Sequence, residues 1–169
     1  LETALVSGEA DVSNGLPSFA IVGLPDTAVS EARERARAAI RNSGFEFPLR
    51  RIVVNLAPAE RRKEGTGFDL AIALAILRAS DQLKTDVDGL CLGELSLDGT
   101  IRPVRGVMPR ILRARDAGIE RAYLPSENAP EAAALGCDAY ALRTLRAAVE
   151  HLDGRVRLPP APMPPPAGD

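Results

Sequence analysis

The chain has 169 residues and a formal net charge of −2, and 46% of its residues are hydrophobic while 26% are charged. This length and composition are typical of one globular domain that buries a core. No apolar run approaches the length of a membrane span and no signal peptide opens the chain, so we expect a cytoplasmic protein without a membrane partner. Because no initiator Met is present, we expect a part excised from a longer protein.

The first third of the chain predicts two strands and an amphipathic helix. The strands are expected over residues 3–12 and 18–22, and the turn between them at Asn14-Gly15, because both residues tolerate positive φ. Asp26 or Thr27 is expected to cap a helix that runs to residue 42. Its apolar stripe at helical spacing consists of Ala28, Val29, Ala32, Ala36, Ala39 and Ile40.

The middle of the chain predicts a buried strand, a loop and a buried helix. Residues 51–56 are rich in β-branched side chains, which favours a strand. A loop with three consecutive basic residues follows over residues 57–67. Asp69 is then expected to cap a helix that is apolar on nearly every side, and such a helix belongs in the interior.

The last part of the chain alternates strands with helices, as parallel α/β units do. Strands are expected over residues 90–95, 101–104, 121–124 and 139–142, and helices over residues 107–116, 127–135 and 145–152. A hairpin turn is expected at Asp98-Gly99. We expect the domain to span residues 1–157 and the proline-rich residues 158–169 to form a linker or a disordered tail.

The cysteines and the histidine favour neither a disulfide nor a metal site. Cys91 and Cys137 lie in apolar segments without CxxC spacing, which favours reduced, buried thiols. His151 is the only histidine, which argues against a structural zinc site and a His-based triad. We therefore expect no metal and no cofactor bound to this chain.

The charge is unevenly distributed. Between residues 33 and 63 there are nine basic and three acidic residues, so this segment carries 9 − 3 = +6. The positive charge of this segment has two possible explanations. It contacts the phosphates of a nucleic acid, or it forms a solvated face or an intersubunit salt-bridge network. Since aromatic residues are scarce, any binding should be salt-sensitive and directed at the backbone. The candidate residues are Arg33, Arg37, Arg41, Arg61, Arg62 and Lys63.

Three long motifs resemble a known family. They are NGLPSFAIVGLPDTAVSEARERARAAIRNSGFEFPLRRIVVNLAPAERRKEGTGFDLAIALAIL, GELSLDGTIRPVRGV and LPSENAPEAA. Together they are similar to the N-terminal domain of the ComM/YifB family of magnesium-chelatase-like AAA+ ATPases. The resemblance implies an α+β fold like the Lon proteolytic domain, in the superfamily named after the second domain of ribosomal protein S5. It also implies a left-handed βαβ crossover, a rare exception to the right-handed rule.

The resemblance also locates a degenerate catalytic dyad. EGTGFDL aligns with the run that carries the Lon-type serine, so that position holds Gly67, and PVRGVMPR aligns with the run that carries the lysine, so that position holds Met108. Neither side chain can serve a Ser–Lys dyad. Thr66 and Lys63 are nearby substitutes in sequence, with Thr66 in place of the nucleophile, and the favoured alternative is a loop that caps the apolar helix. We therefore expect no catalytic residue in this chain.

The AAA+ module that the family implies is absent from this chain, which contains no GxxxxGK[ST] motif for nucleotide phosphates. ATP and Mg²⁺ are implied only for the parent protein, as is a hexameric ring that promotes branch migration in DNA recombination and natural transformation. We expect a non-catalytic accessory domain that contacts its own AAA+ module, other subunits or DNA. The alternatives are a residual Lon-like peptidase and, less favoured, a magnesium chelatase-related subunit.

Overall fold

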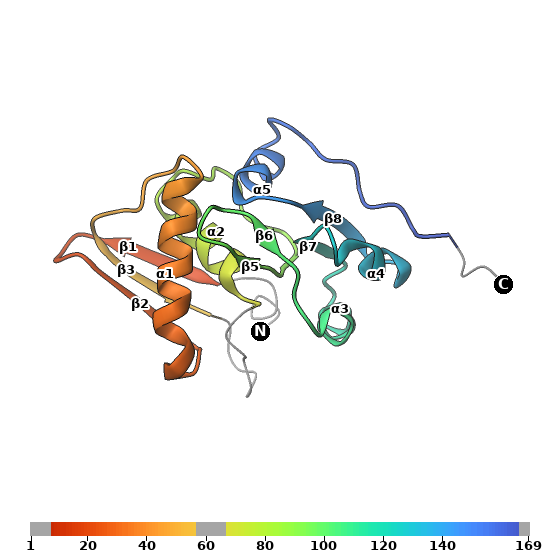
Figure 1. The fold of residues 1–169 in the computed structure, drawn as a ribbon, viewed down its shortest axis with the longest axis horizontal. Coiled ribbons are helices and arrows are strands. Elements are labelled where there is room, and N and C mark those ends of the chain that lie inside the picture. Colours follow the sequence, from red (N-terminus) through yellow and green to blue (C-terminus); the bar gives the residue numbers. More distant parts are fainter. Residues whose placement is uncertain (1–7, 57–66, 166–169) are drawn as a thin grey trace.

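The computed structural model describes residues 8–56 and 67–165. These residues form a mixed α+β architecture with two three-stranded sheets and a short two-stranded hairpin (Figure 1). The expected fold class is therefore confirmed. None of the helices in the described ranges is long and apolar enough to cross a membrane.

The first sheet has the order β1-β3-β2 and contains β1 (Glu9–Ser13), β2 (Ser18–Val22) and β3 (Arg51–Asn55). β1 runs antiparallel to β3, whereas β2 runs parallel to it. The predicted strand over residues 18–22 is confirmed, and β1 begins at residue 9 in the described part of the predicted strand over residues 3–12.

Two helices bury the inner face of this sheet. α1 (Asp26–Asn42) and α2 (Asp69–Ala79) contact each other and pack with β2 and β3 in the larger hydrophobic core. α2 is buried at nearly every position, as its composition predicts. In Figure 1, α1 lies in front of the sheet, β3 lies above β2, and both strands run from left to right. A β2-α1-β3 connection with this path is left-handed.

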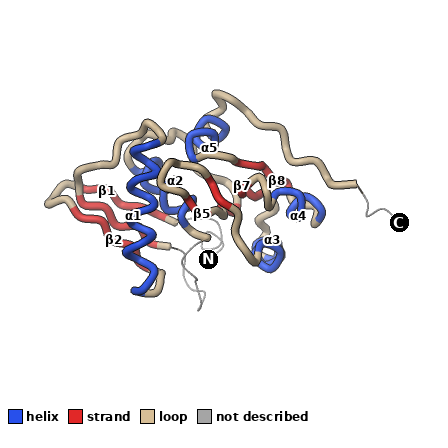
Figure 2. Tube along the Cα trace, viewed as in Figure 1, coloured by secondary structure: helices blue, strands red, loops and turns tan. Residues whose placement is uncertain are grey.

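The second sheet is parallel, with the order β4-β7-β8, and contains β4 (Leu90–Cys91), β7 (Arg121–Pro125) and β8 (Asp138–Leu142). Three helices surround it (Figure 2), namely α3 (Val107–Asp116), α4 (Ala129–Ala134) and α5 (Leu145–Leu152). The bounds of α3 and α5 are those that the sequence predicts, while α4 is shorter at both ends.

The predicted strand over residues 90–95 is wrong as one element, because the chain breaks it at Leu92-Gly93. β4 ends at residue 91, and β5 (Glu94–Leu95) instead forms an antiparallel hairpin with β6 (Ile101–Arg102). The break requires a glycine at position 93. Any other residue would place its Cβ 2.8 Å from Ile101 Cγ2, which is too close. The predicted turn at Asp98-Gly99 is confirmed, and Gly99 has a φ of 94°.

The predicted helix caps are also wrong. α1 begins after Pro25 and α2 after Phe68, and neither helix has a side-chain cap. Asp69 is instead the first residue of α2, and its carboxylate turns inward. An Asp at the start of a helix is usually assigned as its N-cap from local sequence alone. Local sequence cannot show that Asp69 has its partner, Arg35, 34 positions away.

The first residues of the proline-rich tail pack on the domain. The N–H of Leu158 donates to His151 Nδ1 at 2.9 Å, and the N–H of Ala161 donates to Ala139 O at 2.7 Å. Leu158 and Ala161 pack against the two hydrophobic cores. Two hydrogen bonds from backbone N–H groups thus hold part of the segment that composition alone assigns to a linker or a disordered tail.

One buried ion pair joins three elements. Asp69 on α2 is fully buried, and its Oδ2 accepts from Arg35 Nε on α1 at 2.6 Å and from the N–H of Leu95 on β5 at 2.9 Å. Arg35 Nη2 donates to the other carboxylate oxygen at 3.2 Å. Burial raises the pKa of Asp69 to about 6, while the hydrogen bonds from Arg35 and Leu95 oppose that rise. The carboxylate is therefore ionised at neutral pH.

Arg35→Ala should lower the free energy of unfolding by about 3 kcal/mol at pH 7, because it leaves a buried carboxylate without its cation. The loss should shrink towards pH 5. The folded-state pKa of Asp69 already lies above its unfolded value, removing Arg35 raises it further, and protonation then removes the unpaired charge. Urea denaturation at both pH values measures this. Arg78→Ala is the matched control, since Arg78 pairs with Asp86 at the surface and its loss should cost under about 1 kcal/mol. Equal losses of unfolding free energy in both variants would contradict a buried Arg35–Asp69 ion pair.

Candidate functional site

The residue at the degenerate serine position, Gly67, is buried just before α2. Its carbonyl accepts from the N–H of Gly93 at 3.2 Å, and the N–H of Leu70 donates to Gly93 O at 3.0 Å. The break between β4 and β5 therefore holds the start of α2 through two backbone hydrogen bonds. Gly67 is therefore held against the backbone of Gly93.

The guanidinium of Arg110 lies over Gly67. A Cβ built on Gly67 would lie 3.2 Å from Arg110 Cζ and 3.3 Å from its Nη2, with Nη1 closer still. The guanidinium also lies over the ring of Phe68, with Cζ 5.1 Å from the ring centroid. The space that a serine side chain would need is thus occupied by an arginine from α3.

Met108, at the degenerate lysine position, takes no part in this contact. It lies in the first turn of α3 with 46% of its surface exposed. Residues two positions apart on a helix point in directions about 200° apart, so Met108 faces away from the side that carries Arg110. The structure therefore brings Gly67 together with Arg110 and leaves Met108 in solvent. Thr66, the candidate substitute nucleophile, lies outside the described residues.

The three candidate arginines of α1 have internal partners. Arg33 Nη1 donates to Phe19 O on β2 at 3.0 Å. Arg37 lies 5.3 Å from the ring centroid of Phe47 and 3.4 Å from a carboxylate oxygen of Glu34. Arg41 is exposed and lies 5.9 Å from the Phe47 ring, so it is the least engaged of the three. The other candidates, Arg61, Arg62 and Lys63, lie outside the described residues.

A second basic segment lies on β6 and α3, and the charge count over residues 33–63 does not include it. Residues 99–115 contain five arginines and no acidic residue, so this stretch carries +5. The signal was present in the sequence as a run without acids, but the net charge of −2 concealed it. The arginines are Arg102, Arg105, Arg110, Arg113 and Arg115.

A polar cavity of about 380 Å³ lies beside the second sheet. Its side chains are bonded mainly to one another: Asp88 accepts from Tyr123 Oη at 2.5 Å and from Arg121 Nη1 at 2.6 Å. Burial raises the pKa of the Tyr123 hydroxyl, and burial lowers the pKa of His151 at the same wall. The described residues contain no group of three or more His, Cys, Asp or Glu that could hold a metal ion.

Gly67→Ala should destabilise the chain by about 1 kcal/mol, because the new methyl group must displace the Arg110 guanidinium from its place on Phe68. In the Arg110→Ala background the same change should cost nothing measurable, since the space is then open. A double-mutant cycle of urea denaturations measures this coupling. Additive effects of the two changes would show that Arg110 does not occupy the site in solution.

The chain is similar in sequence to several known proteins. The family model described as subunit ChlI of Mg-chelatase matches residues 9–128. The competence protein ComM of Haemophilus influenzae is 43% identical over 164 residues, which cover 94% of this chain and 32% of ComM. The protein YifB of Escherichia coli is 47% identical over 116 residues, which cover 67% of this chain and 23% of YifB.

A weaker likeness extends to proteases. A Lon protease of Trichlorobacter lovleyi is 28% identical over 127 residues, which cover 71% of this chain and 16% of the protease. The chain thus spans less than a third of the length of these relatives. Because the family model covers most of the chain and the homology to ComM and YifB is strong, the chain belongs to the ChlI-like ComM/YifB family.

Proposed function

We propose that this chain is a non-catalytic accessory domain of a ComM/YifB-like AAA+ ATPase. The observation that carries the proposal is the packing at the degenerate dyad, where Arg110 fills the space over Gly67 and Met108 points to solvent. A Ser–Lys dyad needs a nucleophile and a base within hydrogen-bond reach. Neither position supplies such a group, and the Arg110 side chain occupies the space beside Gly67.

The larger protein would supply the motor. ATP and Mg²⁺ would bind in its AAA+ module, and the whole protein would act in the cytoplasm as a hexameric ring on recombining DNA. One relative is named a competence protein, which supports a part in DNA uptake or recombination for that protein. The present domain would assist assembly of the ring and contact DNA or a partner protein. The two basic segments supply the charge that contact with DNA requires.

The competing function, a residual peptidase that uses Thr66, is tested directly. The 169-residue chain should hydrolyse neither casein nor fluorogenic peptides, and its rate should equal that of the Thr66→Ala variant. Fluorescence assays with a Lon protease as the positive control measure the rate. Turnover that Thr66→Ala abolishes would contradict a non-catalytic domain.

DNA contact is tested by fluorescence anisotropy with a labelled single strand and a labelled four-way junction. We expect weak binding that falls at least about tenfold between about 50 and 200 mM salt, because released counterions drive phosphate contacts. Arg41→Glu alone examines the α1 candidates, since Arg33 and Arg37 also hold the fold together. Unchanged binding in this variant would remove α1 from the DNA contact. The absence of binding by the unsubstituted chain at about 50 mM salt would contradict the DNA role.

A further inference from the structure

We infer that β6 and α3 form a surface that binds the phosphate backbone of a nucleic-acid strand. The inference rests on the proposed DNA role and names the surface that carries it. We call this surface the α3 basic face and define it by three exposed arginines. They are Arg102, Arg105 and Arg113, whereas Arg115 points away from Arg113 and donates to Leu135 O.

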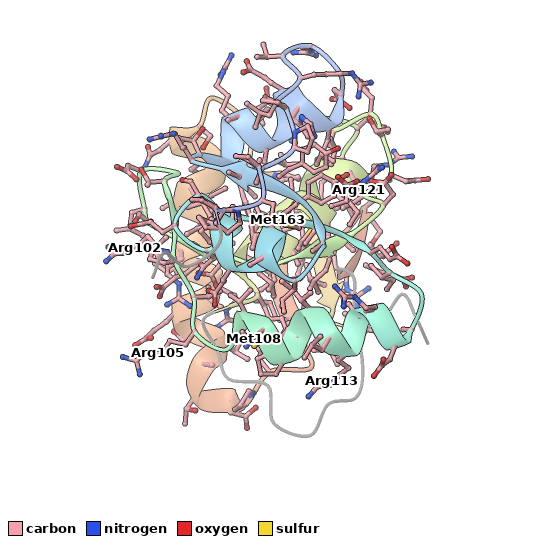
Figure 3. All side chains as sticks on the ribbon, turned by 90° about the vertical axis from the view of Figure 1, so that its right-hand side faces the viewer. Arg102, Arg105, Met108, Arg113, Arg121 and Met163 are labelled. Atoms are coloured by element: carbon pink, nitrogen blue, oxygen red, sulfur yellow. The ribbon has the colours of Figure 1, made fainter. Side chains whose placement is uncertain are left out.

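The α3 basic face lies at one end of the molecule. Figure 3 shows α3 lying across this end, with Arg105, Met108 and Arg113 following one another along it and Arg102 on the adjoining strand. The nearest acids in sequence are Asp98 before the segment and Asp116 at the end of α3. Across the hairpin, Glu94 pairs in register with Arg102 and offsets part of its charge. The segment itself, residues 99–115, contains five arginines and no acidic residue.

The backbone that presents these arginines is held in place. Asn128, which is only 7% exposed, accepts from the N–H of Val104 at 2.9 Å and donates to Val104 O at 3.1 Å. The opposite side of α3 buries Val107, Ile111 and Ala114 in the second hydrophobic core. The arginines therefore extend from a fixed helix and a clamped loop. Such a surface binds an anion without the entropy cost of ordering its backbone.

The dimensions and composition of the face favour a strand of nucleic acid over a single anion. α3 has 10 residues and is therefore about 15 Å long, the length of about four nucleotide steps at 3.4 Å each. Met108 and Leu112, exposed by 46% and 41%, lie among the arginines. They offer apolar contacts to the sugars and bases of a strand whose phosphates the arginines hold.

The α1 arginines are less suited to this task. Arg33 is occupied by a backbone carbonyl of β2, and Arg37 by two aromatic rings and an acid. Moving either guanidinium to a phosphate would give up contacts that hold α1 on the sheet. Arg102 and Arg105 have no such internal role among the described residues, so binding through them costs the fold nothing.

The test compares two double variants of the 169-residue chain. Arg102→Ala/Arg105→Ala removes two charges from the α3 basic face. Arg155→Ala/Arg157→Ala removes two exposed charges from the segment after α5, outside both basic segments. Anisotropy with a labelled single strand is measured across a salt series, and thermal melts confirm that both variants are folded.

We expect the first variant to lose about tenfold in affinity at low salt and to lower the slope of log K against log salt by about 2, while the control stays near the original values. Equal losses in both variants, or none in the first, would overturn the surface assignment while the DNA role stands. No binding by the unsubstituted chain would end the DNA role itself. Binding of polyglutamate as tight as that of DNA would also overturn the inference, because the face would then fit an acidic protein.

Discussion

The fully buried carboxylate of Asp69 connects the elements on which the rest of the fold is arranged. It joins α1 through Arg35, begins α2, and receives the backbone N–H of Leu95 in the hairpin. A buried charge is tolerated only when its partners are well placed, so this contact fixes the relative positions of the three elements. The carboxylate of Asp69 therefore holds α1, α2 and the β5–β6 hairpin together.

Gly67, which the family resemblance aligns with the Lon-type serine, lies two residues before Asp69. Because Asp69 fixes the first turn of α2, Gly67 is held against Gly93, and α3 then places Arg110 over it. Arg110 of α3 therefore contacts the turn that precedes α2. The salt bridge of Asp69, the backbone hydrogen bonds of Gly93 and the Arg110 side chain all lie at this junction.

Much of the fold follows from periodicity. The stripe of α1, the all-round burial of α2, and the bounds of α3 and α5 emerge from the spacing of apolar residues. The break at Gly93 and the inward turn of Asp69 do not, because each depends on a residue far away in the sequence, Ile101 and Arg35 respectively. The left-handed crossover is also not a matter of local pattern, and it was expected from the family resemblance alone.

The candidate site was predictable only in part. That Gly67 and Met108 stand at the positions expected for serine and lysine follows from the family resemblance, but the placement of Arg110 over Gly67 is visible only in the structure. The α1 arginines share a face as their spacing predicts, yet their engagement with Phe19 and Phe47 appears only in three dimensions. Charge counts identify basic segments in the sequence. The structure is needed to show which of their arginines are exposed and not already bonded within the fold, and so can bind a ligand.

We propose that the packing of Arg110 over Gly67 prevents catalysis together with the two missing side chains. The most direct test is a peptidase assay on the variant Gly67→Ser/Met108→Lys, which restores both groups and leaves Arg110 in place. The account predicts no hydrolysis above that of the unsubstituted chain, because position 108 faces solvent and Arg110 covers position 67. Turnover by this variant would contradict it.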